Sequence, residues 1–142
     1  MKYITIFLSI ISVLGITLLN LYYNSLCLDI KMIEKHIKET NFIALEIVKD
    51  ETNLVENKDN YLKRLSNIKQ GLENSKTSIL TKEYIDLKIK SIKNLQICIE
   101  ENNKQYFNMF DEYNRLSEEN LQNLLQRNIF DVTKVPKNLY NL

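Results

Sequence analysis

The sequence is nearly free of the residues that make tight turns. It has only two glycines, Gly15 and Gly71, and one proline, Pro136, in 142 residues. An all-β or α/β fold needs many more turn formers than this. Two isolated glycines also leave no glycine-rich loop that could cradle a phosphate. The shortage therefore predicts an all-α protein built from long helices.

Residues that usually carry catalysis or bind metals are also scarce. His36 is the single histidine of the chain, so a metal centre or a histidine-activated nucleophile would have to be built around it. Glu34 and Glu39 lie nearby in the sequence, but a solvated histidine on a helix explains this pattern better. No close pair of acids stands out for acid–base chemistry. We therefore expect no enzyme activity, no cofactor and no bound metal.

The charges of the chain nearly cancel. The net charge of +1 gives no overall attraction to nucleic acid or to anionic lipid. Basic residues gather between Lys58 and Lys93, and acidic residues gather between Glu100 and Glu119. Only Tyr61 and Tyr84 are interleaved with the basic residues, whereas a nucleic-acid surface needs more aromatics among them. The two segments could pair head to tail between protomers or form two docking faces. Solvated helix faces explain them better, and we expect no nucleic-acid partner.

One segment is long, apolar and free of charge. Residues 3–23 would form a helix of roughly 31 Å, which matches the hydrocarbon core of a bilayer at about 30 Å. Tyr3 lies at one end, and Tyr22 and Tyr23 lie at the other, where aromatic rings favour the membrane interface. The run is longer than the apolar region of a signal peptide, and the best cleavage position, after Gly15, is a poor one. We therefore expect residues 1–27 to be an uncleaved membrane anchor in contact with lipid.

The orientation of this anchor depends on the flanking charges. Lys2 precedes the apolar run, while Lys31, Lys35 and Lys38 follow it among acidic residues. The balance of positive charge is therefore not decisive. A signal-like span behind a very short tail usually keeps the N-terminus in the cytoplasm. We expect a cytoplasmic N-terminus and an exported helical domain.

Residues 28–130 show the periodicity of several helices. An apolar stripe continues the anchor helix into the low fifties: Leu26, Ile30, Ile33, Ile37, Ala44 and Ile47. The polar run Glu56–Asn60 is the best break. A second helix then carries Tyr61, Leu65, Ile68 and Leu72 at heptad spacing. A turn at 74–78 and an N-cap at Thr81 precede the next helix. We expect an elongated antiparallel hairpin, a three-helix bundle or a coiled coil, followed by a flexible tail at 131–142.

The third helix raises the question of partners. Its apolar stripe is interrupted by two polar residues, Lys88 and Asn102. Residues 101–104 could form a turn and give four helices, but the stripe keeps its phase across them, so we expect one long helix. Such a helix would project beyond the second one. A projecting apolar stripe predicts self-association or a partner helix.

Aromatic residues are densest in the second half of this helix. Tyr106, Met109, Phe110 and Tyr113 share a face, which core packing explains better than a ligand pocket or a binding hot spot does. Phe107 lies off that face and is our candidate for contact with a partner.

The two cysteines are too far apart for an intrachain disulfide. Cys27 lies at the end of the span, and Cys98 lies about 25 Å into the third helix, far beyond the reach of a disulfide. We expect two independent thiols, with Cys27 as the candidate for an intermolecular disulfide.

These features predict a single-pass membrane-anchored α-helical interaction module, such as an envelope scaffold, adaptor or assembly component. One alternative is an extracytoplasmic helical bundle that senses a small molecule through the aromatic residues. Another is a phage lysis protein of the spanin kind, whose layout of short tail, single span and exported helical domain resembles this one.

Overall fold

The computed structural model describes residues 2–49 and 51–127. Every regular element in this part of the chain is a helix: α1 (Lys2–Lys49), α2 (Glu51–Glu73), the short 3-10 helix η1 (Ile79–Thr81), α3 (Lys82–Glu101) and α4 (Lys104–Leu125). The predicted all-α class is therefore confirmed. The predicted tail at 131–142, with Pro136, lies outside the described residues.

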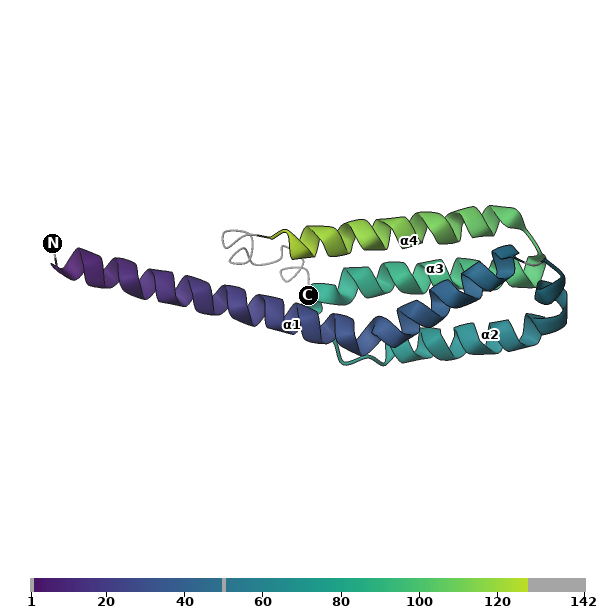
Figure 1. Ribbon diagram of the computed structural model, residues 1–142, viewed down its shortest axis with the longest axis horizontal. Helices are drawn as coiled ribbons and strands as arrows, with labels where there is room; N and C mark the ends of the chain where they lie inside the picture. The colour runs from purple at the N-terminus through teal and green to yellow at the C-terminus, as the bar shows by residue number, and fades with distance from the viewer. Residues whose placement is uncertain (1, 50, 128–142) are drawn as a thin grey trace, which may run out of the picture.

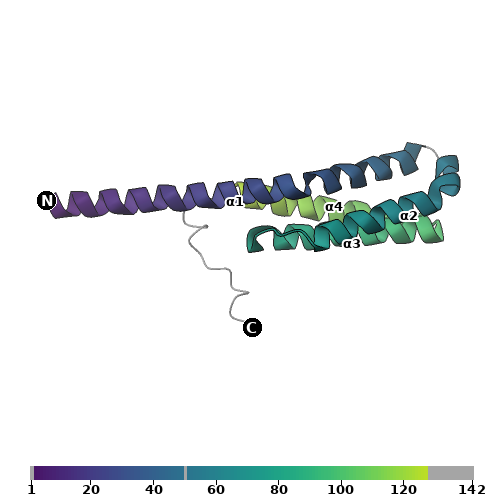
Figure 2. The same ribbon diagram turned by 90° about the horizontal axis from the view of Figure 1, so that it is seen from below.

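The second half of α1 and the helices α2, α3 and α4 form an antiparallel bundle. The first half of α1 projects alone from one end of the bundle, while the second half packs beside the other helices (Figures 1 and 2). α2 runs back toward the projecting half, α3 runs away from it, and α4 returns (Figure 1). We call the end from which α1 projects the anchor end; it carries residues 74–81 and 124–127. The opposite distal end carries residues 47–49 and 102–104.

α1 is one continuous helix, as its uninterrupted apolar stripe predicts. It extends from Lys2 to Lys49, and Leu26, Ile33 and Ile47 on its stripe are buried. The stripe of α2 is confirmed in the same way, because Leu65 and its neighbours at heptad spacing are all buried. Helical periodicity therefore identified the core-facing side of both helices correctly.

The predicted break at Glu56–Asn60 is wrong. These residues lie inside α2, where their side chains are exposed or half-buried. Lys58 Nζ donates to the carbonyl oxygen of Glu100 at 2.7 Å. The last carbonyls of a helix have no partner within the helix, so Lys58 satisfies one at the end of α3. The polar run faces outward and supports a neighbouring helix end.

The single long third helix is also wrong, because the chain reverses at Asn102. Asn102 adopts a left-handed conformation with φ of 51°, and it ends α3. Asparagine tolerates this conformation better than most residues, and a helix commonly ends on it. Asn103 then caps α4, since its side chain accepts from the Gln105 N–H at 3.0 Å. α4 therefore folds back along α3, and the projecting stripe that predicted a partner is absent.

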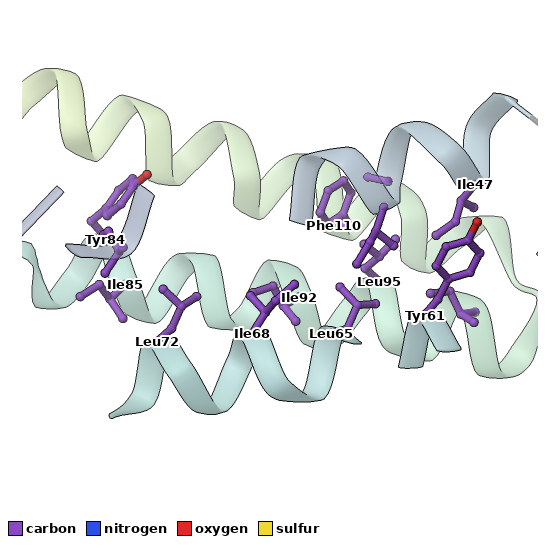
Figure 3. Packing of buried hydrophobic residues seen from close by; sticks show 14 residues of the cluster. Ile47, Tyr61, Leu65, Ile68, Leu72, Tyr84, Ile85, Ile92, Leu95 and Phe110 are labelled. Carbon is purple, nitrogen blue, oxygen red and sulfur yellow. The ribbon is translucent and has the colours of Figure 1, made fainter. Parts of the chain in front are cut away.

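The main core is built by all four helices. Ile47 of α1, Leu65 of α2, Leu95 of α3 and Phe110 of α4 point into one interior (Figure 3). A second, smaller cluster at the anchor end joins Tyr22 and Leu26 to Leu124. The core thus extends from the distal end to the point where α1 leaves the bundle.

Lys88, the other polar interruption of the stripe, is a buried cation between α3 and α4. It is 4% exposed, and its Nζ lies 2.6 Å from both Asn114 Oδ1 and Glu118 Oε1. It also lies 5.5 Å from the ring centroid of Tyr84. A shifted register of α4 would leave this charge buried without its partners, which is costly. Lys88 therefore favours the observed pairing of the two helices.

Candidate functional site

The part of α1 that the bundle leaves uncovered has the length of a membrane span. Between Tyr3 and Leu21 nearly all large apolar side chains are at least 45% exposed. Packing against other elements begins at Tyr22. Residues 3–21, with Gly15 among them, extend roughly 28 Å as a helix, close to the hydrocarbon thickness of a bilayer at about 30 Å. By length and composition, α1 is the one helix among the described residues that could cross a membrane.

Tyr22 and Tyr23, predicted as interfacial aromatics, also bind the end of α4. The Tyr22 hydroxyl donates to the Leu124 carbonyl at 2.9 Å, and the Tyr23 hydroxyl donates to the Arg127 carbonyl at 2.7 Å. Tyr23 lies 3.3 Å from the Leu125 carbonyl as well. The final carbonyls of a helix need such donors. The two tyrosines therefore join the last turn of α4 to the end of the apolar segment.

Asp29 forms a second connection at the anchor end, which the sequence analysis missed. Its carboxylate is 4% exposed and accepts the Ser78 N–H at 3.0 Å, together with the hydroxyls of Ser78 and Thr81. Thr81 precedes α3 as predicted, but its side chain makes no capping bond to that helix. We call Asp29, Ser78 and Thr81 the Asp29 latch. It fastens the α2–α3 connection to α1.

A signal for the Asp29 latch was present in the sequence. Asp29 continues the three- and four-residue spacing of the buried residues Tyr22, Leu26 and Ile33. A carboxylate at a core position requires hydrogen-bond donors. The predicted turn at 74–78, with the adjacent Thr81, supplied serine and threonine for that purpose.

At the distal end, Phe107 lines a shallow apolar groove. The groove has a volume of about 330 Å³ and lies between the end of α1 and the α3–α4 turn. Its apolar wall comes from Ile47, Val48, Cys98 and Phe107, and its polar rim includes Lys104 and Asn108. Phe107 also packs against the main core, so it is half-buried. Its predicted contact with a partner stays a prediction, but it lies at an accessible apolar surface.

The four aromatic residues of α4 do not surround one cavity. Phe107 and Phe110 are in ring contact at 5.4 Å, and Phe110 is buried in the core. Tyr106 and Tyr113 are half-buried, and Lys90 Nζ lies 5.8 Å from the Tyr113 ring centroid. Core packing therefore accounts for Phe110, as expected. A pocket lined jointly by the four residues has no counterpart in this arrangement.

The two cysteines lie in different surroundings. Cys27 is exposed just beyond the tyrosines, while Cys98 is buried on α3, and both are free thiols. Burial raises the pKa of the Cys98 thiol, which lowers its reactivity at neutral pH. An intermolecular disulfide through Cys27 stays a prediction.

His36 is half-buried and faces Gly71 of α2. A Cβ atom added at Gly71 would lie 2.5 Å from His36 Cε1. The glycine therefore makes room for the imidazole ring where α1 and α2 meet. Within the described part of the chain, no group of three histidine, cysteine, aspartate or glutamate side chains could hold a metal ion.

Comparisons with protein-family models, with curated proteins and with solved structures give no match to this chain.

Proposed function

We propose that the protein is a single-pass membrane-anchored α-helical interaction module that acts by protein–protein contact, as an envelope scaffold, adaptor or assembly component. The observation that carries the proposal is the difference in packing between the two halves of α1. Its first half matches the thickness of a bilayer, and nearly all of its large apolar side chains are exposed, while its second half is built into the bundle. Such a helix holds a folded domain at a constant distance from the membrane.

The distal groove is the proposed contact surface. Val48 on its wall is 62% exposed. Apolar patches with polar rims are typical of protein interaction sites. The partner is a second copy of the chain or a partner helix. We further propose that the N-terminus is cytoplasmic and that the bundle is exported, since the span is signal-like.

Site-specific photo-crosslinking in membranes tests this function. A photoreactive amino acid in place of Asn108, on the groove rim, is expected to give a crosslinked product above the 16.8 kDa chain. The same reagent at Glu112, one turn along α4 and exposed, serves as the matched control. The change Val48→Asp should abolish the product from position 108, because a carboxylate on the groove wall opposes apolar contact.

The outcomes separate the possibilities. A product at twice the chain mass means a second copy, and a different mass means another protein. Equal products from positions 108 and 112, or a product that survives Val48→Asp, would contradict contact at the groove.

A further inference from the structure

Between Glu56 and Arg127, the large apolar side chains that are exposed lie at one end of the molecule. From Glu56 to Arg127 the described side chains include two highly exposed large apolar residues, Ile79 at 62% and Leu125 at 43%. Ile79 begins η1 and Leu125 ends α4. Both elements lie at the anchor end, beside the point where α1 leaves the bundle (Figure 1). Packing within the bundle does not explain why two large apolar side chains are exposed at the same end.

Hydrogen bonds fix the height of both residues relative to the span. Leu125 lies at the edge of the span, because Tyr23 binds its carbonyl. Ile79 follows Ser78, which is bonded to Asp29, and Asp29 lies about two helical turns, or roughly 10 Å, beyond Tyr22. The headgroup layer extends roughly 5–7 Å beyond the hydrocarbon on each side, so Asp29 lies just above this layer and the Ile79 side chain must extend toward the membrane to enter it. The neighbouring Leu80 packs against the cluster of Tyr22, Leu26 and Leu124, which lies between Asp29 and the hydrocarbon.

We propose that the anchor end of the bundle rests on the bilayer, with the side chains of Ile79 and Leu125 inserted among the lipid headgroups. This is a second membrane contact in addition to the span, and it rests on the proposed function because it requires residues 3–21 to be in the membrane. The occupant is lipid, since Leu125 lies at the height at which the span emerges and Leu80, next to Ile79, packs against the cluster of Tyr22, Leu26 and Leu124 just above it.

The charges around η1 indicate that the contact is apolar. Lys76 and Lys82 are exposed on either side of η1, and Glu73 and Glu83 are exposed beside them. Asp86 lines one groove together with Ile79, and Arg127 lies two residues beyond Leu125. The three cations and three anions leave this surface without a net charge, so it has no preference for anionic headgroups. The contact is therefore expected in bilayers of zwitterionic lipid alone.

Spin-label depth measurement on the full chain tests the proposal. The protein, with Cys27→Ser and Cys98→Ala, is placed in zwitterionic phosphatidylcholine nanodiscs, and a nitroxide is attached to a cysteine introduced at one position at a time. The positions are Ile79, Leu125, Leu14 within the span, and Glu112 on the exposed face of α4. The quantity measured is the ratio of collision rates with oxygen, which favours lipid, and with a water-soluble nickel complex.

We expect the collision-rate ratios for labels at positions 79 and 125 to shift from the value at position 112 toward the value at position 14. Equal ratios at 79, 125 and 112, with a lipid value at 14, would overturn the membrane contact while leaving the anchor intact. A water value at 14 would overturn the anchor itself, and with it the proposed function. Dipolar broadening at 79 or 125 that disappears on dilution with unlabelled protein would show a second copy at this surface, and would also overturn the proposal.

Discussion

The Thr81 hydroxyl donates to Asp29 Oδ2 at 2.9 Å, across 52 positions of the sequence. Asp29 belongs to the helix that leaves the bundle, and Thr81 belongs to the connection between α2 and α3. Together with the two bonds from Ser78, this contact holds a buried carboxylate that has no partner on its own helix among the interactions described. The Asp29 latch therefore sets the position of the α2–α3 connection relative to the span.

Removing the Asp29 carboxylate should weaken the fold. Asp29→Ala removes the acceptor of the Ser78 N–H and hydroxyl and leaves the Thr81 hydroxyl only its longer bond to the Ser78 carbonyl, so we expect a loss of about 2–3 kcal/mol in the free energy of unfolding. Asp29→Asn keeps one acceptor oxygen and should lose less. Denaturant unfolding in detergent, followed by circular dichroism, measures both changes. Asp86→Ala, at an exposed carboxylate on α3, is the control, and an equal loss there would contradict a specific role for the latch.

The contact between Gly71 and His36 predicts that the effect of Gly71→Ala on stability changes sign when the His36 side chain is removed. A double-mutant cycle measures this change. Alanine in place of glycine in an open helix gains up to about 1 kcal/mol. Here the added methyl group would meet the imidazole ring, so we expect Gly71→Ala to lose about 1 kcal/mol through overpacking. In the His36→Ala background the same change should become stabilising. Thermal unfolding of the four proteins gives the coupling, and additive effects would rule out the proposed steric contact.

The α3–α4 turn should respond to the identity of residue 102 through backbone conformation. Asn102→Gly should be neutral or slightly stabilising, because glycine adopts a positive φ without strain. Asn102→Ala should lose about 1–2 kcal/mol, since alanine carries the full left-handed penalty without the local hydrogen bonds of asparagine. The side chain at 102 is exposed, so packing is little affected. Melting temperatures compare the two variants, and equal losses for glycine and alanine would contradict this explanation.

Alkaline conditions should destabilise the protein through Tyr84. Burial, and then the charge of Glu118, raise the pKa of Tyr84 above its ordinary value of 10. Above about pH 10 the unfolded chain releases this proton while the folded chain retains it, so stability falls as pH rises. Below that pH the stabilisation is fully present. Tyr84→Phe should reduce the slope of stability between pH 10 and 11, measured by denaturant unfolding, and an unchanged slope would argue against this origin.

Periodicity predicted the buried faces because a helix repeats its apolar positions wherever it packs. It did not predict the reversal at Asn102, and the reason is physical. After the turn, α4 must bury its own stripe in the same core, so an unbroken phase says which face is apolar and nothing about chain direction. Lys88 and Asn102 were both visible as interruptions of the stripe. One is a buried cation with partners on α4, and the other ends α3.

Contacts between distant parts of the chain were beyond what spacing could predict. The bond from Tyr22 to Leu124 joins residues 102 positions apart, and it exists because α4 returns to the anchor end. A tyrosine at the end of an apolar run is equally compatible with a membrane interface alone. Likewise, the apolar groove beside Phe107 forms because α1 ends next to the turn between α3 and α4. This depends on the relative lengths of the helices, which the spacing of apolar residues within one helix does not predict.

The continuity of α1 makes the protein a lever. From Tyr22 to Lys49 the helix extends roughly 40 Å, and the tyrosine bonds to α4 together with the Asp29 latch make the bundle follow it. A longer or shorter hydrocarbon layer changes the tilt of a spanning helix. A change of about 10° in that tilt would displace the distal groove by roughly 7 Å along the membrane plane, as the length of the arm requires. With residues 3–21 in a membrane, as we propose, bilayer thickness would determine where the groove lies relative to the membrane.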